Sequence, residues 1–109
     1  MQTPAIAGPV LERALITIRP GRESEFEAAF AEAKQVIASA DGFGWLELHR
    51  GVEAPDVYLL LVCWQALEDH MQGFRESERF TRWRELIGPY FATPPDVQHY
   101  TPVVGRFTG

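Results

Sequence analysis

The chain has 109 residues, of which 46% are hydrophobic and 23% charged, a composition that predicts one soluble domain with its own core. The net charge of −5 argues against a nucleic-acid partner or an acidic membrane surface, because phosphate binding needs clustered Lys and Arg. The single cysteine excludes an internal disulfide and a multi-cysteine metal site. No stretch approaches the ~18 apolar residues of a membrane span, and the N-terminus lacks signal-peptide features, so we expect a cytoplasmic protein.

The first third of the chain predicts an arm, a strand and a helix. Residues 1–9 hold two prolines and a glycine and predict a flexible arm, which places the single domain at 10–109. Residues 10–19 (VLERALITIR) are rich in branched apolar side chains and predict a strand that Pro20-Gly21 ends. A helix follows, because apolar residues then recur at helical spacing: Phe26, Ala29, Phe30, Ala33, Val36 and Ile37.

The rest of the chain alternates between segments with the pattern of a strand and segments with the pattern of a helix. It predicts two strands, two helical segments and a last strand, at 43–50, 57–64, 65–73, 77–87 and 97–104. The loop 51–56 is built of turn formers and is short enough for a hairpin. Gly88-Pro89 ends the second helical segment, and Pro102 suits a strand end.

This order, βαββαβ, is that of the ferredoxin-like α+β fold, an antiparallel four-stranded sheet with helices on one face. The strand 57–64 (VYLLLVCW) has no charge, Gly or Pro and does not alternate apolar with polar residues. Such a strand should be covered on both faces. Since 109 residues supply too few helices to cover both, we expect a homodimer in which a second copy covers the open face of the sheet.

The segment from Trp64 to Trp83 reads W-x-A-L-x-x-H-x-x-x-F-x-x-S-x-x-F-x-x-W. With the opening strand, the Pro20-Gly21 turn and the acidic first helix, it resembles the antibiotic biosynthesis monooxygenase (ABM) family. That family belongs to the dimeric α+β barrel superfamily, and the resemblance covers roughly residues 10–104. It implies a dimeric barrel. Because the family includes haem-degrading enzymes, quinone-forming oxygenases and isomerases, the resemblance alone leaves the reaction open.

Three positions depart from the patterns of those branches. The haem-degrading branch has an Asn and an axial His where this chain has Ala14 and Trp83, so the imidazole that would hold haem iron is missing. The quinone-forming branch has an Asn four residues before the strand-end Trp, a position that Leu60 occupies here. A Leu cannot donate a hydrogen bond to a substrate oxygen. We therefore expect Ala14, Leu60 and Trp83 to contact substrate without supplying the Asn and His groups of those branches.

Two residues are candidates for catalysis. His70 shares a helical face with Leu67, Met71 and Phe74, and its imidazole is suited to act as a general base. The alternative is a buried His with one satisfied hydrogen bond. Trp64, at a strand end, offers an indole N–H for a polar substrate and a ring for stacking, or else is simply a core residue.

The remaining polar candidates are weaker. Phe74 is expected to be a wall of the site, and Arg84, next to Trp83, is a candidate for binding an anionic substrate group. His49 and His99 lack the spacing of metal ligands and are expected to form hydrogen bonds at the rim or in the dimer interface. In the strand 43–50, alternation places His49 on the same face as Phe43, Trp45 and Glu47. Cys63 is expected to be inert on the opposite face from Trp64. Nucleotide-binding and zinc-binding motifs are absent from the sequence, so we expect neither cofactor nor metal.

The preferred hypothesis is a homodimeric, cofactor-independent monooxygenase that acts on a small aromatic or enolisable molecule, with His70 as base and Trp64 as stacking partner and hydrogen-bond donor. A phenolate or enolate can pass an electron to O₂ directly, so the protein needs only to deprotonate, orient and exclude water. The alternatives are an isomerase or tautomerase that uses His70 as a proton shuttle, and a small-ligand-binding dimer without catalysis.

Overall fold

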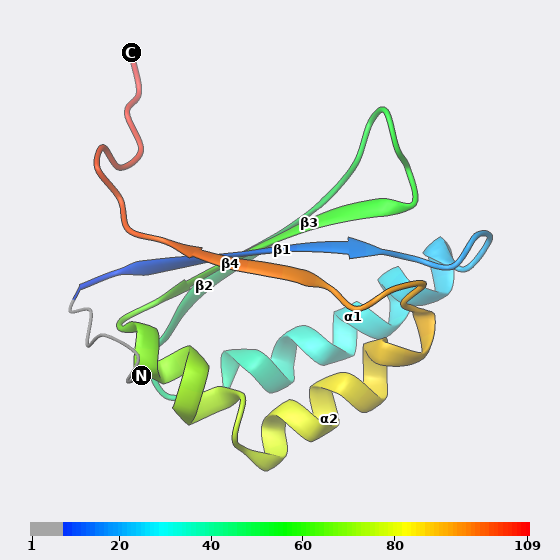
Figure 1. Ribbon diagram of the computed structural model, residues 1–109, viewed down its shortest axis with the longest axis horizontal. Coiled ribbons are helices and arrows are strands. Elements are labelled where there is room, and N and C mark those ends of the chain that lie inside the picture. Colours follow the sequence, from blue (N-terminus) through cyan, green and yellow to red (C-terminus); the bar gives the residue numbers. More distant parts are fainter. Residues whose placement is uncertain (1–7) are drawn as a thin grey trace.

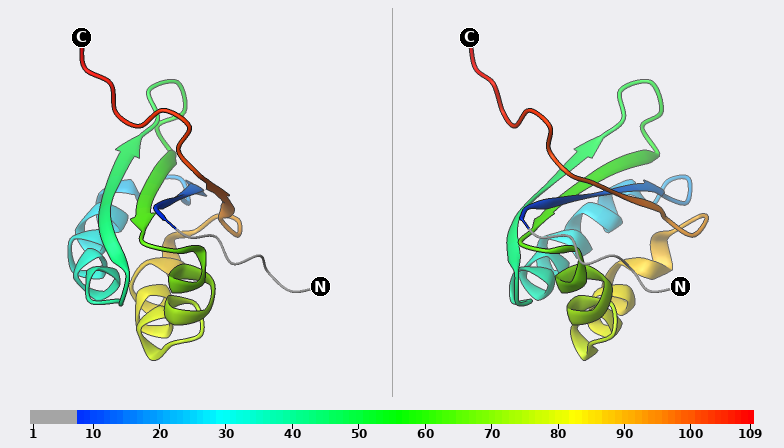
Figure 2. Two further views of the ribbon diagram at one scale, coloured as in Figure 1. Left: turned by 90° about the vertical axis from the view of Figure 1, so that its left-hand side faces the viewer. Right: turned by 60° about the vertical axis from the view of Figure 1, so that its left-hand side comes forward.

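A computed structural model describes residues 8–109 and confirms the α+β, ferredoxin-like fold. In chain order the elements are β1 (Val10–Thr17), α1 (Glu23–Ala38), β2 (Phe43–Arg50), β3 (Val57–Trp64), the π-helix η1 (Asp69–Phe74), α2 (Glu78–Ile87), the short 3₁₀-helix η2 (Gly88–Tyr90) and β4 (Asp96–Tyr100). The strands form one antiparallel sheet in the order β2-β3-β1-β4. Figures 1 and 2 show all helices on the same face of that sheet.

Several predicted bounds were wrong by a few residues. Strand β1 ends at Thr17 because Ile18 makes only an isolated bridge to Phe91. Strand β4 ends at Tyr100, shortly before Pro102, which has no N–H to continue a ladder. Of the predicted arm, residues 1–7 lie outside the described part of the chain. No helix in residues 8–109 combines the length and apolar character that crossing a membrane requires.

The core lies between the helices and the inner face of the sheet. Strict alternation along β1 and β3 directs every second side chain toward the helices, where each is buried. From β3 these are Tyr58, Leu60, Val62 and Trp64. The stripe of α1 that the sequence predicted packs against them through Phe26, Phe30, Ala33 and Ile37, and α2 adds Trp83 and Ile87.

Strand β2 does not present the single polar and aromatic face that its sequence predicted. A register shift between Phe43 and Trp45 places Phe43 opposite Trp64, and the two rings pack edge to face. Beyond the shift, Leu46 and Leu48 pack on the core, so Trp45, Glu47 and His49 lie on the open face instead. The shift is a β-bulge, which adds one residue to one strand and so reverses the faces on either side of it.

The open face of the sheet carries apolar side chains along its two central strands. Strand β3 presents its alternate set, Val57, Leu59, Leu61 and Cys63, which is half-buried within one chain. On the neighbouring strands Leu15 is 37% and Trp45 44% exposed. A soluble protein that leaves such a patch uncovered risks non-specific association. The patch is consistent with the dimer predicted from the sequence, which remains a prediction.

We expect the chain to sediment at micromolar concentration with twice its mass of 12.3 kDa. Leu59→Arg places a charge at the centre of the open face and should convert the dimer to a folded monomer, because an unpaired charge in an apolar interface is strongly unfavourable. Gln35→Arg adds the same charge on the exposed side of α1 and should leave the dimer intact. A wild-type monomer at these concentrations would contradict the predicted barrel.

Candidate functional site

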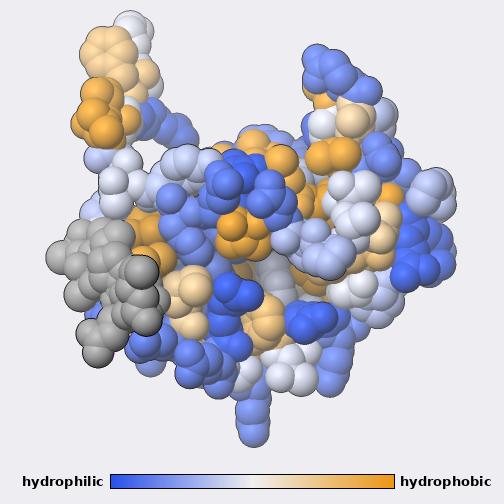
Figure 3. All heavy atoms as spheres, viewed as in Figure 1, coloured by the Kyte–Doolittle hydropathy of each residue, from blue (hydrophilic) through white to orange (hydrophobic). Residues whose placement is uncertain are grey.

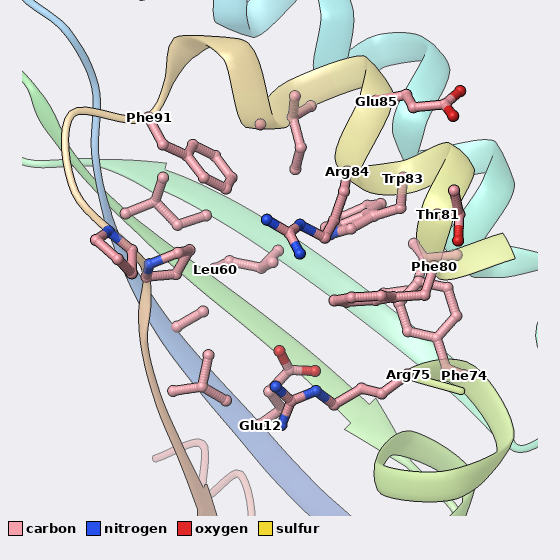
Figure 4. A pocket seen from close by; sticks show the side chains of 18 of the residues that line it. Glu12, Leu60, Phe74, Arg75, Phe80, Thr81, Trp83, Arg84, Glu85 and Phe91 are labelled. Carbon is pink, nitrogen blue, oxygen red and sulfur yellow. The ribbon is translucent and has the colours of Figure 1, made fainter. Parts of the chain in front are cut away.

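A cavity of about 830 Å³ lies between the sheet and α2. Its floor is formed by inward side chains of the sheet, including Ala14, Leu60 and Val97, and the small Ala14 side chain leaves space above the strand. Aromatic rings form its walls: Phe74, Phe80, Trp83 and Phe91 (Figure 4). The loop 88–95 borders the mouth, which opens between β4 and α2 on the face seen in Figure 3.

A buried polar cluster lies at one end of this cavity. Glu12 of β1 is 5% exposed and His70 of η1 is 3% exposed. The indole Nε1–H of Trp64 donates to Glu12 Oε1 at 3.0 Å, and His70 Nε2 lies 3.3 Å from the same oxygen. On the other side of the imidazole, His70 Nδ1 and His99 Nε2 share a hydrogen bond of 2.7 Å. Strand pairing brings these residues together, because Glu12 of β1 is directly opposite His99 of β4.

The contacts around His70 assign its tautomer. Glu12 Oε1 already accepts the proton of Trp64, so a proton on His70 Nε2 is attracted to that oxygen, whereas a lone pair would be repelled by it. His70 Nδ1 is then the acceptor, and His99 Nε2–H donates to it. The N–H groups of Trp64 and His70 therefore both point to Oε1 of Glu12, and the N–H group of His99 points to His70.

The second carboxyl oxygen of Glu12, Oε2, is open to the cavity. No hydrogen bond within residues 8–109 uses it, and no fully buried polar side-chain atom there lacks a partner. Oε2 is therefore accessible to water or to a bound molecule. Glu12 lines the cavity, and Figure 4 shows its carboxyl group between the strands and the side chain of Arg75.

Burial shifts the ionisation of the cluster. It raises the pKa of Glu12 from 4.5 to about 7, although the hydrogen bond from Trp64 and the charge of Arg75 act in the opposite direction. Burial, followed by His99 and Arg75, lowers the pKa of His70 to about 3, and burial with Arg75 also lowers the pKa of His99. Near neutral pH both imidazoles are thus uncharged, and Glu12 is the group that gains and loses a proton.

The π-helix η1 places His70 and Arg75 on the same side. The helix predicted over 65–73 is present and buries Leu67, His70 and Phe74, but its second part is a π-helix. The backbone N–H of Arg75 donates to the carbonyl of His70 at 3.0 Å, a bond between residues five apart. Residues five apart in an α-helix point in different directions, whereas a π-turn brings them nearly into line. Both residues consequently line the cavity.

Most of the predicted site residues line the cavity. This holds for His70 and for all five predicted substrate contacts, Ala14, Leu60, Phe74, Trp83 and Arg84. His70, however, is buried and has a lowered pKa, so it is a poor base at neutral pH. Trp64 is fully buried, donates its N–H to Glu12 and stacks on His70 at a ring distance of 5.3 Å. The direct substrate contact predicted for Trp64 does not fit this burial, and its ring instead holds the acid–base cluster in place.

Three residues of the site were missed or misplaced by the sequence reasoning. Glu12 was not considered, although it is the one charged residue among the inward positions Val10, Glu12, Ala14 and Ile16 of a strand. Arg75 was also missed. His99 was assigned to hydrogen bonding at the rim or in the dimer interface; it is half-buried, and its hydrogen-bond partner is His70, which the sequence did not indicate. Glu12, His70 and His99 are metal-ligand types, but across residues 8–109 no three His, Cys, Asp or Glu side chains are grouped as a metal ion requires.

Comparison with known proteins places the chain in a family. The family model for antibiotic biosynthesis monooxygenase, ABM, matches residues 9–86. The chain belongs to the ABM family. It is 38% identical over 94 residues to the uncharacterized protein YczJ of Bacillus subtilis (strain 168), a match that covers 86% of this chain and 99% of YczJ.

Solved structures of ABM proteins share the fold. A protein from Bordetella bronchiseptica, with the proposed assignment of antibiotic biosynthesis monooxygenase, is 43% identical with a TM-score of 0.86, covering 89% of this chain and 99% of its own. SnoaB from Streptomyces nogalater, a cofactor-independent oxygenase, is 18% identical with a TM-score of 0.77, covering 91% of this chain and 97% of its own. At that identity SnoaB supports the fold alone.

Proposed function

We propose that this ABM protein is a cofactor-independent monooxygenase that acts on a small aromatic or enolisable substrate in the helix–sheet cavity, with Glu12 as the base. The observation that carries the proposal is a buried carboxyl group with one oxygen open to a cavity walled by aromatic rings. Family membership supports an ABM-type function in general. The description of SnoaB as a cofactor-independent oxygenase is consistent with the finer proposal.

The reaction begins with proton transfer to Glu12. Ionised Oε2 takes a proton from an acidic C–H or O–H of the substrate, and the resulting carbanion or phenolate passes one electron to O₂. The substrate radical and superoxide combine to form a C–O bond, and the proton returned by Glu12 gives a hydroperoxide. Removal of the second C–H proton then breaks the O–O bond. For a methylene substrate the sum is R₂CH₂ + O₂ giving R₂C=O + H₂O.

The other residues of the cluster act through Glu12. Trp64 and His70 hold Oε1, which directs Oε2 toward the cavity and prevents the carboxyl group from rotating. His99 fixes the tautomer of His70. The aromatic walls Phe74, Phe80 and Trp83 stack on a flat substrate and limit the access of water to its anion. In this arrangement Trp64, His70 and His99 are positioning residues.

The same base also fits the isomerase alternative, because Glu12 could return its proton to a different atom of the substrate. The two reactions differ in their use of O₂. We would incubate the protein with anthrone, a flat ketone with an acidic methylene group, and follow oxygen with an electrode. A monooxygenase consumes one O₂ per anthrone, forms anthraquinone and water, and places one atom of ¹⁸O₂ in the product; added catalase returns no oxygen.

Exchange of the methylene protons in D₂O without oxygen consumption would contradict the oxygenase proposal and favour an isomerase. Binding without either reaction would favour the small-ligand-binding alternative. The Glu12→Gln variant serves as the blank, since uncatalysed oxidation of anthrone is unaffected by it.

A further inference from the structure

We infer that Arg75 and Arg84 form a binding site for a carboxylate group of the substrate, so that the cavity prefers an aromatic or enolisable carboxylic acid to a neutral molecule of similar shape. The inference rests on the proposed function for the identity of the cavity as the substrate site. It adds a chemical class to the substrate, and it assigns to Arg75 a role that the sequence did not suggest.

Both guanidinium groups lie over the ring of Phe80, and Figure 4 shows them on opposite sides of it. Arg75 follows η1 and Arg84 lies on α2, and their guanidinium carbons are 5.9 and 6.0 Å from the centre of the Phe80 ring. All three residues line the cavity. Figure 4 shows both arginine side chains extending from the helical side into the cavity, Arg75 toward Glu12 and Arg84 toward Leu60. Contact with a ring face favours a cation and restricts where each head group lies.

Neither cation forms an ion pair with a carboxylate in the described part of the chain, although the charge of Arg75 acts on the nearby Glu12. Of the seven other arginines there, five form ion pairs with Asp or Glu, namely Arg13, Arg22, Arg50, Arg82 and Arg106. The remaining two, Arg19 and Arg79, donate hydrogen bonds to the carbonyl of Phe91 and the hydroxyl of Ser39. Arg75 has only a weak contact of 3.8 Å to the thioether of Met71. Glu85 also lines the cavity, but in Figure 4 its carboxylate points away from both arginines. In a chain of net charge −5, two unpaired cations beside an apolar cavity indicate a site for an anion.

Carboxylate is the anion that this arrangement fits. A guanidinium group presents parallel N–H donors that match the two oxygens of a carboxylate. Two positive charges also balance the reaction proposed above, because deprotonation adds an enolate or phenolate charge to the carboxylate charge already present. The flat, apolar part of the acid would then lie against Phe74 and Trp83, with its acidic proton toward Glu12.

Binding of two matched probes tests the inference without any turnover. We would titrate 2-naphthoate and the neutral 2-naphthamide into the intact protein by calorimetry at pH 6, where Glu12 is protonated. Wild-type protein should bind naphthoate at least about tenfold more tightly than naphthamide, as expected for a charge-assisted hydrogen bond. Arg75→Gln and Arg84→Gln should each reduce that preference, and the double variant should abolish it.

Arg82→Gln is the matched control, because Arg82 is also on α2 but pairs with Glu32 on the outer surface. It should keep the preference, and thermal melts should show all variants folded. Equal binding of the two probes, no binding of naphthoate, or an equal loss in Arg82→Gln would overturn the inference. If the protein prefers naphthoate but consumes no oxygen, the proposed oxygenase function is contradicted and the carboxylate site is supported.

Discussion

Replacing Glu12 with Gln should lower kcat by about 10²–10⁴-fold, the range expected for loss of a general base, while substrate affinity changes little. Gln is similar in size and its amide oxygen can still accept the N–H of Trp64, so the cluster is retained and only the ionisable group is lost. The rate of oxygen uptake with anthrone measures the effect. Glu53→Gln, the same change at an exposed position of the β2–β3 loop, should leave the rate unaltered.

The pH profile separates a base from a merely structural Glu12. Wild-type kcat/KM should rise with pH through about 7, where Glu12 ionises. The groups facing Glu12 are Trp64, His70, His99 and Arg75, and of these only Arg75 is charged near neutral pH. Since its charge lowers the pKa of Glu12, Arg75→Gln should move the inflection to higher pH. An inflection unchanged by Arg75→Gln would contradict the influence of Arg75 on Glu12, and full activity in Glu12→Gln would remove Glu12 from the mechanism.

The same Glu12→Gln substitution should make the protein more stable than wild type at alkaline pH. The pKa of Glu12 is raised on folding from 4.5 to about 7, so the folded state holds the proton more tightly than the unfolded state. Wild-type stability therefore falls as pH rises from about 4.5 to 7, by up to ~3 kcal/mol in total, and Gln avoids this loss. The free energy of unfolding in urea, at pH 5 and pH 8 and at equal protein concentration, measures it.

The lowered pKa of His70 changes stability with pH in the opposite direction, and it does so at acid pH. Its pKa is lowered on folding from 6.5 to about 3, so it contributes stability above pH 6.5 that is lost as pH falls toward 3. Both proteins retain His70, so the difference between wild type and Glu12→Gln isolates the carboxyl group. That difference should grow from pH 5 to pH 8. A constant difference would mean that Glu12 ionises as it does in water.

The fold was predictable because its signals are local and repeat over many residues. The apolar strand 57–64 buries every second residue, and the helical stripe of α1 buries Phe26, Phe30, Ala33 and Ile37, with Ala29 and Val36 partly buried. Two irregularities that the sequence did not reveal lie where one residue breaks a period. The bulge between Phe43 and Trp45 and the π-turn after Asp69 both add a residue that no regular pattern reveals.

The site was less predictable because it depends on register between strands distant in sequence. His99 reaches His70 only because β4 pairs with β1 at Glu12, and nothing near residue 99 indicates this. Glu12 could have been found from alternation alone, as a charge in an inward position. Its raised pKa, however, depends on the closure of the helices over it.

The π-helix η1 has a consequence for comparing relatives of this protein by sequence. Residues 69–74 hold one more residue per turn than an α-helix would, so a relative with a regular helix here needs one residue fewer to reach the same cavity. An alignment without a gap would then match either the equivalent of His70 or that of Arg75, but not both. Deleting Gln72 or Gly73 should mimic such a relative and turn one of these two side chains out of the cavity.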